Sequence, residues 1–130
     1  MALTSTSKLE NYKNNLDVAG ADISTILDEV QGGKISRTAT AVTYTALTTD
    51  HYIGVTRTAA ARTINLPAAA TAGAGKTYIV KDESGAAGTN NVTIDDGNAS
   101  ETIDGATTKV INSNYGVVRL VCDGANWFTY

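Results

Sequence analysis

The string from Ala70 to Thr77 matches a relaxed phosphate-binding loop, with alanine in place of the first glycine. Such a loop needs a strand before it and a helix after it, because the helix N-terminus helps to hold the phosphates. Here β-branched and aromatic residues follow Lys76, and Pro67 with a run of alanines precedes the loop. We interpret the string as a glycine-rich loop that enters a strand; nucleotide binding through Lys76 is the alternative.

The chain has one histidine and one cysteine, which cannot build a zinc site from His and Cys ligands alone. His51 adjoins Asp50, and a hydrolase triad would have to add Ser84, which lacks the nucleophile-elbow pattern. We expect a strand-edge histidine and a turn serine. Cys122 lies in an apolar run and is expected to be a buried, inert thiol. The sequence therefore predicts no enzyme, no metal and no other cofactor.

Four acidic residues cluster between two predicted strands: Asp95, Asp96, Glu101 and Asp104. Calcium takes oxygen ligands at loop spacing, but the EF-hand pattern is absent. Solvated Asp-Gly turns are the preferred interpretation, and a calcium site is the alternative.

Aromatic residues gather at the C-terminus, where Trp127, Phe128 and Tyr130 would stack on sugar rings if they were exposed. In a strand, alternation places Trp127 on one face and the other two on the opposite face. At least one of these faces should belong to the core, which weakens the prediction of a sugar-binding platform.

The composition excludes several classes of protein. The chain has 130 residues, a size typical of a single domain, with 20 threonines, 19 alanines and a net charge of −3. The ten Lys and Arg residues are scattered singly, so no nucleic-acid partner is expected. No apolar run is long enough for a transmembrane helix and no signal peptide is recognisable, so we expect no membrane partner and synthesis in a cytoplasm.

The first 33 residues have a helical pattern, with a capping box from Ser7 to Glu10 and a glycine stop at Gly32 and Gly33. Gly20 leaves two short helices as the alternative to one. So short a segment is not stable alone, and we expect it to be an anchoring or oligomerisation arm; an amphipathic helix that packs on the chain's own β-domain is the alternative. Its apolar seam has heptad spacing. The seam residues are Leu9, Tyr12, Leu16, Ala19, Ile23, Ile26 and Val30.

After Gly33 the apolar period changes to two, and eight short β-branched runs separated by turn residues predict strands. Asp123 to Asn126 is expected to be the turn of the last hairpin, and Ala68 to Gly75 a surface loop. The predicted fold is mainly β: a compact antiparallel β-sandwich or barrel-like domain over residues 34–130, with a short N-terminal helical arm over residues 1–33.

The stretch from Tyr44 to Tyr130 resembles a β-module found in bacteriophage head decoration, head fibre and tail fibre proteins. The resemblance rests on several ordered motifs, and it implies a β-structured virion surface element, often trimeric, without catalytic residues. The motifs are Tyr52 to Val55, Thr63 to Ala70, Ala74 to Asp82, Asn90 to Asp95, Glu101 to Ala106, Asn114 to Gly116 and Asp123 to Trp127.

A receptor-reaching fibre normally has a long shaft, and none is recognisable in this sequence. We therefore expect a capsid decoration or cement protein of the virion, a homotrimer whose arm contacts the major capsid protein or neighbouring copies. The alternative is a tail fibre or tail-tip adhesion protein that binds a host surface glycan or receptor.

Overall fold

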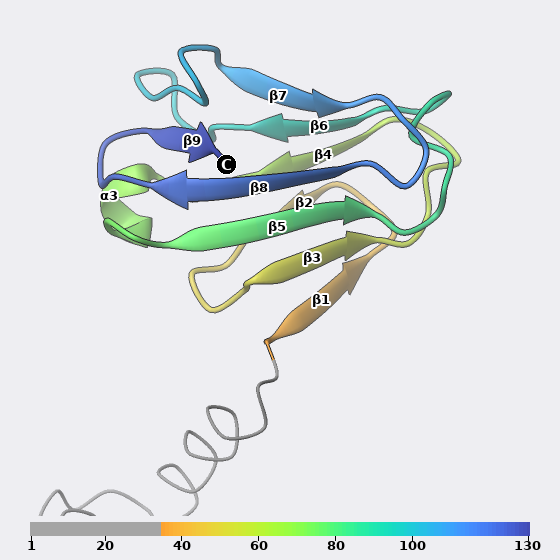
Figure 1. Cartoon of the computed structure of the whole chain (residues 1–130), viewed down its shortest axis with the longest axis horizontal. Coiled ribbons are helices and arrows are strands. Elements are labelled where there is room, and N and C mark those ends of the chain that lie inside the picture. The colour runs from red at the N-terminus through yellow and green to blue at the C-terminus, as the bar shows by residue number, and fades with distance from the viewer. Residues whose placement is uncertain (1–34) are drawn as a thin grey trace, which may run out of the picture. The chain divides into compact units, whose positions relative to one another are not determined.

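A computed structural model of the chain describes residues 35–130. The helical arm over residues 1–33 and the seam from Leu9 to Val30 lie outside the described residues. The β-domain forms one compact unit from Ser36 to Tyr130 (Figure 1). Its elements, in chain order, are β1 (Arg37–Thr40), β2 (Tyr44–Thr45), β3 (Tyr52–Val55), β4 (Arg62–Asn65), α3 (Ala69–Ala72), β5 (Thr77–Asp82), β6 (Val92–Asp95), β7 (Thr108–Ile111), β8 (Val117–Cys122) and β9 (Trp127–Thr129).

The strands form two mixed sheets, which confirms a mainly β domain. The five-stranded sheet has the order β1-β3-β5-β8-β9, and the four-stranded sheet has the order β2-β4-β6-β7. Both orders leave edge strands, so the described domain is not a closed barrel. Figure 1 shows the sheets as two layers, with α3 at one end.

The expectation of an antiparallel domain is wrong for its first half. From β1 to β6 the chain alternates between the two sheets, so each strand lies parallel to the strand two before it. Only the later strands reverse: β7 pairs antiparallel with β6, β8 with β5, and β9 with β8. Short strands bounded by turn residues are the same in sequence whether the chain turns back within one sheet or crosses to the other, so composition did not distinguish them.

The first of the eight runs predicted from the sequence extends from Thr38 to Thr45, and the structure divides it into two strands in different sheets. Thr40 ends β1, and its hydroxyl donates to the Val42 carbonyl at 2.9 Å and accepts the Val42 N–H at 3.3 Å. Threonine competes in this way with a regular strand backbone, because its side chain satisfies nearby main-chain groups. The bend lets β2 join the second sheet.

The predicted surface loop after Pro67 contains the short helix α3, so that expectation is wrong in part. Alanine is the best helix former, and Gly73, with φ +86°, ends the helix. Ala69 is buried, so α3 contributes to the core. The expected last hairpin is confirmed: β8 and β9 pair with Cys122 opposite Trp127, around the turn from Asp123 to Asn126.

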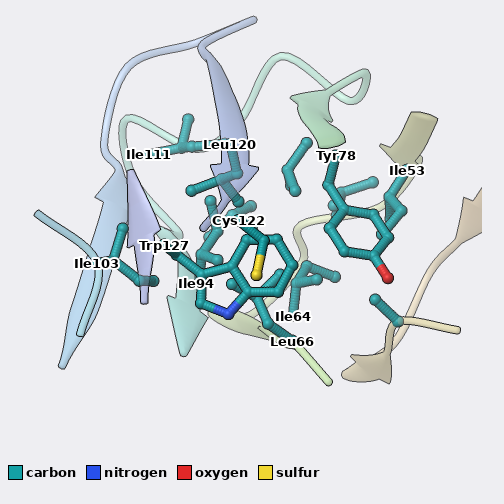
Figure 2. Close-up of a cluster of buried hydrophobic side chains, with 14 of the residues drawn as sticks. Ile53, Ile64, Leu66, Tyr78, Ile94, Ile103, Ile111, Leu120, Cys122 and Trp127 are labelled. Atoms are coloured by element: carbon teal, nitrogen blue, oxygen red, sulfur yellow. The ribbon is translucent and has the colours of Figure 1, made fainter. Parts of the chain in front are cut away.

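One apolar core lies between the sheets (Figure 2). The five-stranded sheet contributes Ile53, Val80 and Leu120, and the four-stranded sheet contributes Ile64 and Ile94, all fully buried. Every second residue of these strands points inward, so the opposite residues form the two outer faces.

Candidate interaction surface

Lys76 is held by protein groups at the entry to β5. Its ammonium group donates to the Asp50 carbonyl and lies 4.8 Å from the centre of the Tyr78 ring. Burial lowers the pKa of Lys76, and the nearby Asp50 carboxylate partly offsets this. β5 begins at Thr77, which confirms that the loop enters a strand, and α3 precedes the lysine instead of following it. The order of elements therefore differs from that of a phosphate-binding loop.

Asp50, His51 and Ser84 have separate partners, and within residues 35–130 no hydrogen bond joins the three side chains. His51 Nδ1 lies 3.3 Å from the Thr77 hydroxyl, and Ser84 Oγ donates to Asp82 Oδ1 at 2.6 Å. Burial alone would raise the pKa of Asp50, but hydrogen bonds from Thr38 and other groups outweigh it and lower the pKa. The structure does not assemble these residues into a triad.

The four residues of the acidic cluster have different roles. Asp95 and Asp96 accept N–H groups within their own turn, whereas Glu101 reaches the first turn of α3. Asp104 accepts from the Thr129 N–H and hydroxyl beside β9. Among the described residues, no group of three His, Cys, Asp or Glu side chains is placed to hold a metal ion.

Cys122 is buried, as expected. Its sulfur donates to the Ala69 carbonyl at 3.4 Å and accepts the Gly124 N–H at 3.2 Å. Burial raises the pKa of the thiol, so the protonated, unreactive form dominates at neutral pH.

The C-terminal aromatics divide between the two faces of β9 as alternation predicts. Trp127 is fully buried, and its ring centre lies 5.5 Å from that of Tyr78 (Figure 2). Phe128 is 43% exposed and Tyr130 is 65% exposed. One face therefore completes the core, and the other is available for contact.

The exposed aromatics belong to the outer face of the five-stranded sheet, where pairing sets the rows of side chains. One row of side chains crosses the whole sheet and includes Arg119. It ends at Tyr130, whose N–H donates to the Arg119 carbonyl. A second row ends at Phe128, and a third ends at Val117, which is 44% exposed. We call this set the outer aromatic face. It comprises Tyr52, Ile79, Val117, Arg119, Val121, Phe128 and Tyr130, and Arg37, Thr77 and Lys81 lie in the same rows.

A charged cluster lies at the β1 side of this face. The guanidinium of Arg37 forms an ion pair with Glu83, and the Tyr52 hydroxyl donates to Glu83 Oε1 at 3.0 Å. The hydrogen bond from Arg37 lowers the pKa of Glu83, against the opposing effect of burial. A Cβ at Gly54 would collide with the Glu83 carboxyl group, so glycine makes room for the cluster.

The outer face of the four-stranded sheet has a different character. It presents short polar side chains, except for Val110, which is 41% exposed. Aromatic residues and arginine are enriched in protein–protein interfaces, whereas threonine is under-represented among the residues that dominate binding energy. Of the two outer faces, the aromatic one therefore has the composition of a contact surface. The short polar residues are Thr45, Thr63, Asn65, Thr93, Asp95 and Thr108.

No protein-family model matches the chain, and no curated protein matches it in sequence. The described part of the chain contains no helix of sufficient length and apolar character to cross a membrane.

Asp82 is an important residue that composition did not identify. Its carboxylate is fully buried at the end of β5 and accepts N–H groups from Ser84, Gly85, Ala87 and Tyr115. The only sequence signal is a polar turn after a strand, which does not reveal that the side chain faces inward. This residue organises the loop and the start of β8, and it lies away from the outer aromatic face.

Proposed function

We propose that this chain is a structural component of bacteriophage particles, a decoration or cement protein that stabilises the capsid as a homotrimer. In this role the chain has no enzymatic activity and acts by binding the major capsid protein and neighbouring copies of itself. The observation that carries the proposal is the outer aromatic face, together with the resemblance of several sequence motifs to phage virion modules.

The motifs on which this resemblance rests form strands and turns of the domain. Tyr52 to Val55 coincides with β3, and the motif from Asn90 to Asp95 contains β6. Asp123 to Trp127 contains the hairpin turn that presents Phe128. The resemblance therefore concerns the residues that build both sheets and support the aromatic face.

A cement protein stabilises a shell by adding interfaces between subunits, so its effect depends on its concentration and on the number of contacts made at once. On the aromatic face, Arg119 lies between Ile79 and Tyr130 in one row. Arginine and tyrosine contribute disproportionately to binding energy because they combine a large contact area with hydrogen-bonding groups. We infer that this face makes the contacts, while the arm adds a second point of attachment.

Size-exclusion chromatography with light scattering on the full chain tests self-association. We expect a trimer for the wild type and a large loss of association for Phe128→Asp. Val110→Asp is the matched control, because Val110 is 41% exposed and Phe128 is 43% exposed on opposite outer faces. A wild-type monomer at high concentration, or equal loss in both variants, would contradict self-association through this face.

Position on the particle needs a separate experiment. Disrupted virions are fractionated into heads and tails, and the chain is located by antibody labelling. We expect it on heads, and we expect shells without it to break at lower temperature than shells that carry it.

The alternative is a tail fibre or tail-tip adhesion protein, which the exposure of Phe128 and Tyr130 favours because exposed rings stack on sugars. This role predicts labelling on tails and binding to host cell-wall glycan that Tyr130→Ala weakens. Labelling on heads together with a silent glycan array would reject it.

A further inference from the structure

A shallow hollow of about 580 Å³ lies at one end of the four-stranded sheet. β2, β4 and β6 run parallel and end together there, so their last residues, Thr45, Asn65 and Asp95, lie side by side in register. The segment after β6 supplies Asp96 and Asn98 to the same lining. Oxygen-bearing residues from three strands and one loop therefore line this end of the sheet.

Asp96 is the unusual member of this lining. It is only 3% exposed, and its Oδ1 accepts the Asn98 N–H at 3.0 Å. Its Oδ2 is buried without a hydrogen-bond partner, and no described Lys, Arg or His forms an ion pair with it. A buried carboxylate is costly unless it is paired or coordinates a metal, so this oxygen indicates a positively charged ligand.

The backbone fixes the loop tightly against the sheet. Gly97 has φ +73°, and a Cβ at this position would collide with the Leu66 carbonyl oxygen, so only glycine fits there comfortably. Asp95 Oδ1 accepts the Gly97 N–H at 2.9 Å, and its other oxygen has no hydrogen bond within residues 35–130. Both carboxylates thus have one oxygen committed to the turn and one oxygen left over.

We propose that this hollow binds a divalent cation of the calcium type, with Asp95 and Asp96 as the charged ligands. Two carboxylates balance the charge of one such ion, and neutral oxygens from Thr45 and Asn65 can complete the shell. Calcium accepts six to eight oxygen ligands in flexible geometry, so it does not need a third acidic residue. Calcium–oxygen distances of about 2.3–2.6 Å are shorter than most hydrogen bonds from water, so the ion needs less room beside the Asp96 carboxylate than a water molecule would.

The site has only two charged ligands, and it is open to solvent on one side. We therefore expect a dissociation constant of about 10⁻⁴ to 10⁻³ M, as in low-affinity calcium modules. Magnesium should bind more weakly, because it requires near-ideal octahedral geometry and releases its waters reluctantly.

Calorimetry and thermal unfolding of the full chain, freed of metal by a chelator, test the proposal. Titration with calcium chloride should give saturable binding and a rising unfolding temperature, with a smaller response to magnesium chloride. Asp96→Asn keeps the acceptor for the Asn98 N–H but removes the charge, so it should abolish the calcium response.

Asp123→Asn is the matched control. Asp123 is exposed and also accepts backbone N–H groups in a turn, so this variant loses the same charge away from the hollow. It should keep the wild-type response. The proposal is overturned by a wild type that shows no saturable response, by equal responses to calcium and magnesium, or by equal loss in Asp123→Asn. If Asp96→Asn does not fold, Asp95→Asn decides: retained calcium binding in that variant also overturns the proposal.

Discussion

The Glu101 carboxylate accepts the Ala69 N–H with both of its oxygens, at 2.9 and 3.0 Å, and so binds the first turn of α3 to the loop after β6. This contact joins residues 32 positions apart in a buried setting. The N-cap residue Ala68 offers no side-chain acceptor, so Glu101 replaces the usual cap.

Glu101→Ala should lower the free energy of unfolding by about 1–3 kcal/mol, because it leaves a buried N–H without a partner. Glu101→Gln keeps one acceptor oxygen and should lose less than half as much. Urea unfolding measures both variants. Equal losses would show that charge, and not the hydrogen bond, dominates this contact.

Trp127 and Phe128 are neighbours on opposite faces of β9, and their truncation should have opposite consequences. Trp127→Ala removes a fully buried ring and should cost about 3–5 kcal/mol of stability. Phe128→Ala should cost less than about 1 kcal/mol and mainly weaken self-association. Chemical denaturation and light scattering on both variants separate the effects; a severe stability loss in Phe128→Ala would contradict this division.

The sequence predicted most strands because β-branched residues alternate with polar ones at the right period. Trp127 and Phe128 were assigned to opposite faces on this basis, and the structure bears the assignment out. Only the hairpin of β8 and β9 was predicted, from its Asp-Gly turn. The pairing of the other strands could not be predicted, since their connections carry no signal that distinguishes a hairpin from a crossing to the other sheet.

The outer aromatic face was predictable only in part. Alternation identified Phe128 and Tyr130 as candidates, whereas Ile79 and Arg119 join them only through the pairing of β5 with β8. Asp82 was missed for a related reason: whether a polar residue at the end of a strand points inward depends on the register of that strand.

Cys122 should be unreactive in the folded chain, because its sulfur is buried and the pKa of its thiol is raised. We expect labelling by a thiol reagent to be slow in native buffer and complete in denaturant. In native buffer, the labelling rate should follow the population of molecules in which the domain is open. Fast native labelling would contradict the buried position.

Protonation of Asp82 should lower the stability of the folded domain in acid. Burial alone would raise the pKa of this carboxyl, but hydrogen bonds from Ser84, Ala87 and Tyr115 outweigh it and lower the pKa from its ordinary 3.8. The folded state therefore favours the ionised form. The stabilisation is complete above about pH 5 and is lost as the pH falls through 3.8 toward the folded-state pKa.

Asp82→Asn tests this dependence. The variant should lose about 3 kcal/mol near neutral pH, because an amide cannot accept all the N–H groups that the carboxylate accepts. The difference from wild type should shrink as the pH falls below 3.8. A difference that stays constant between neutral and acid pH, measured by urea unfolding, would contradict the assignment.

Gly54 and Glu83 should be energetically coupled, because a Cβ at Gly54 would displace the Glu83 carboxyl group from Arg37. Gly54→Ala should destabilise the wild type modestly, since the Glu83 carboxyl group must move away from Arg37 and the Tyr52 hydroxyl, and ion pairs at the surface contribute little. In a Glu83→Ala background the obstacle is gone, and Gly54→Ala should be neutral or slightly stabilising, because alanine loses less backbone entropy than glycine. A double-mutant cycle by urea unfolding measures the coupling. Equal effects of Gly54→Ala in both backgrounds would show that the glycine is required by something other than Glu83.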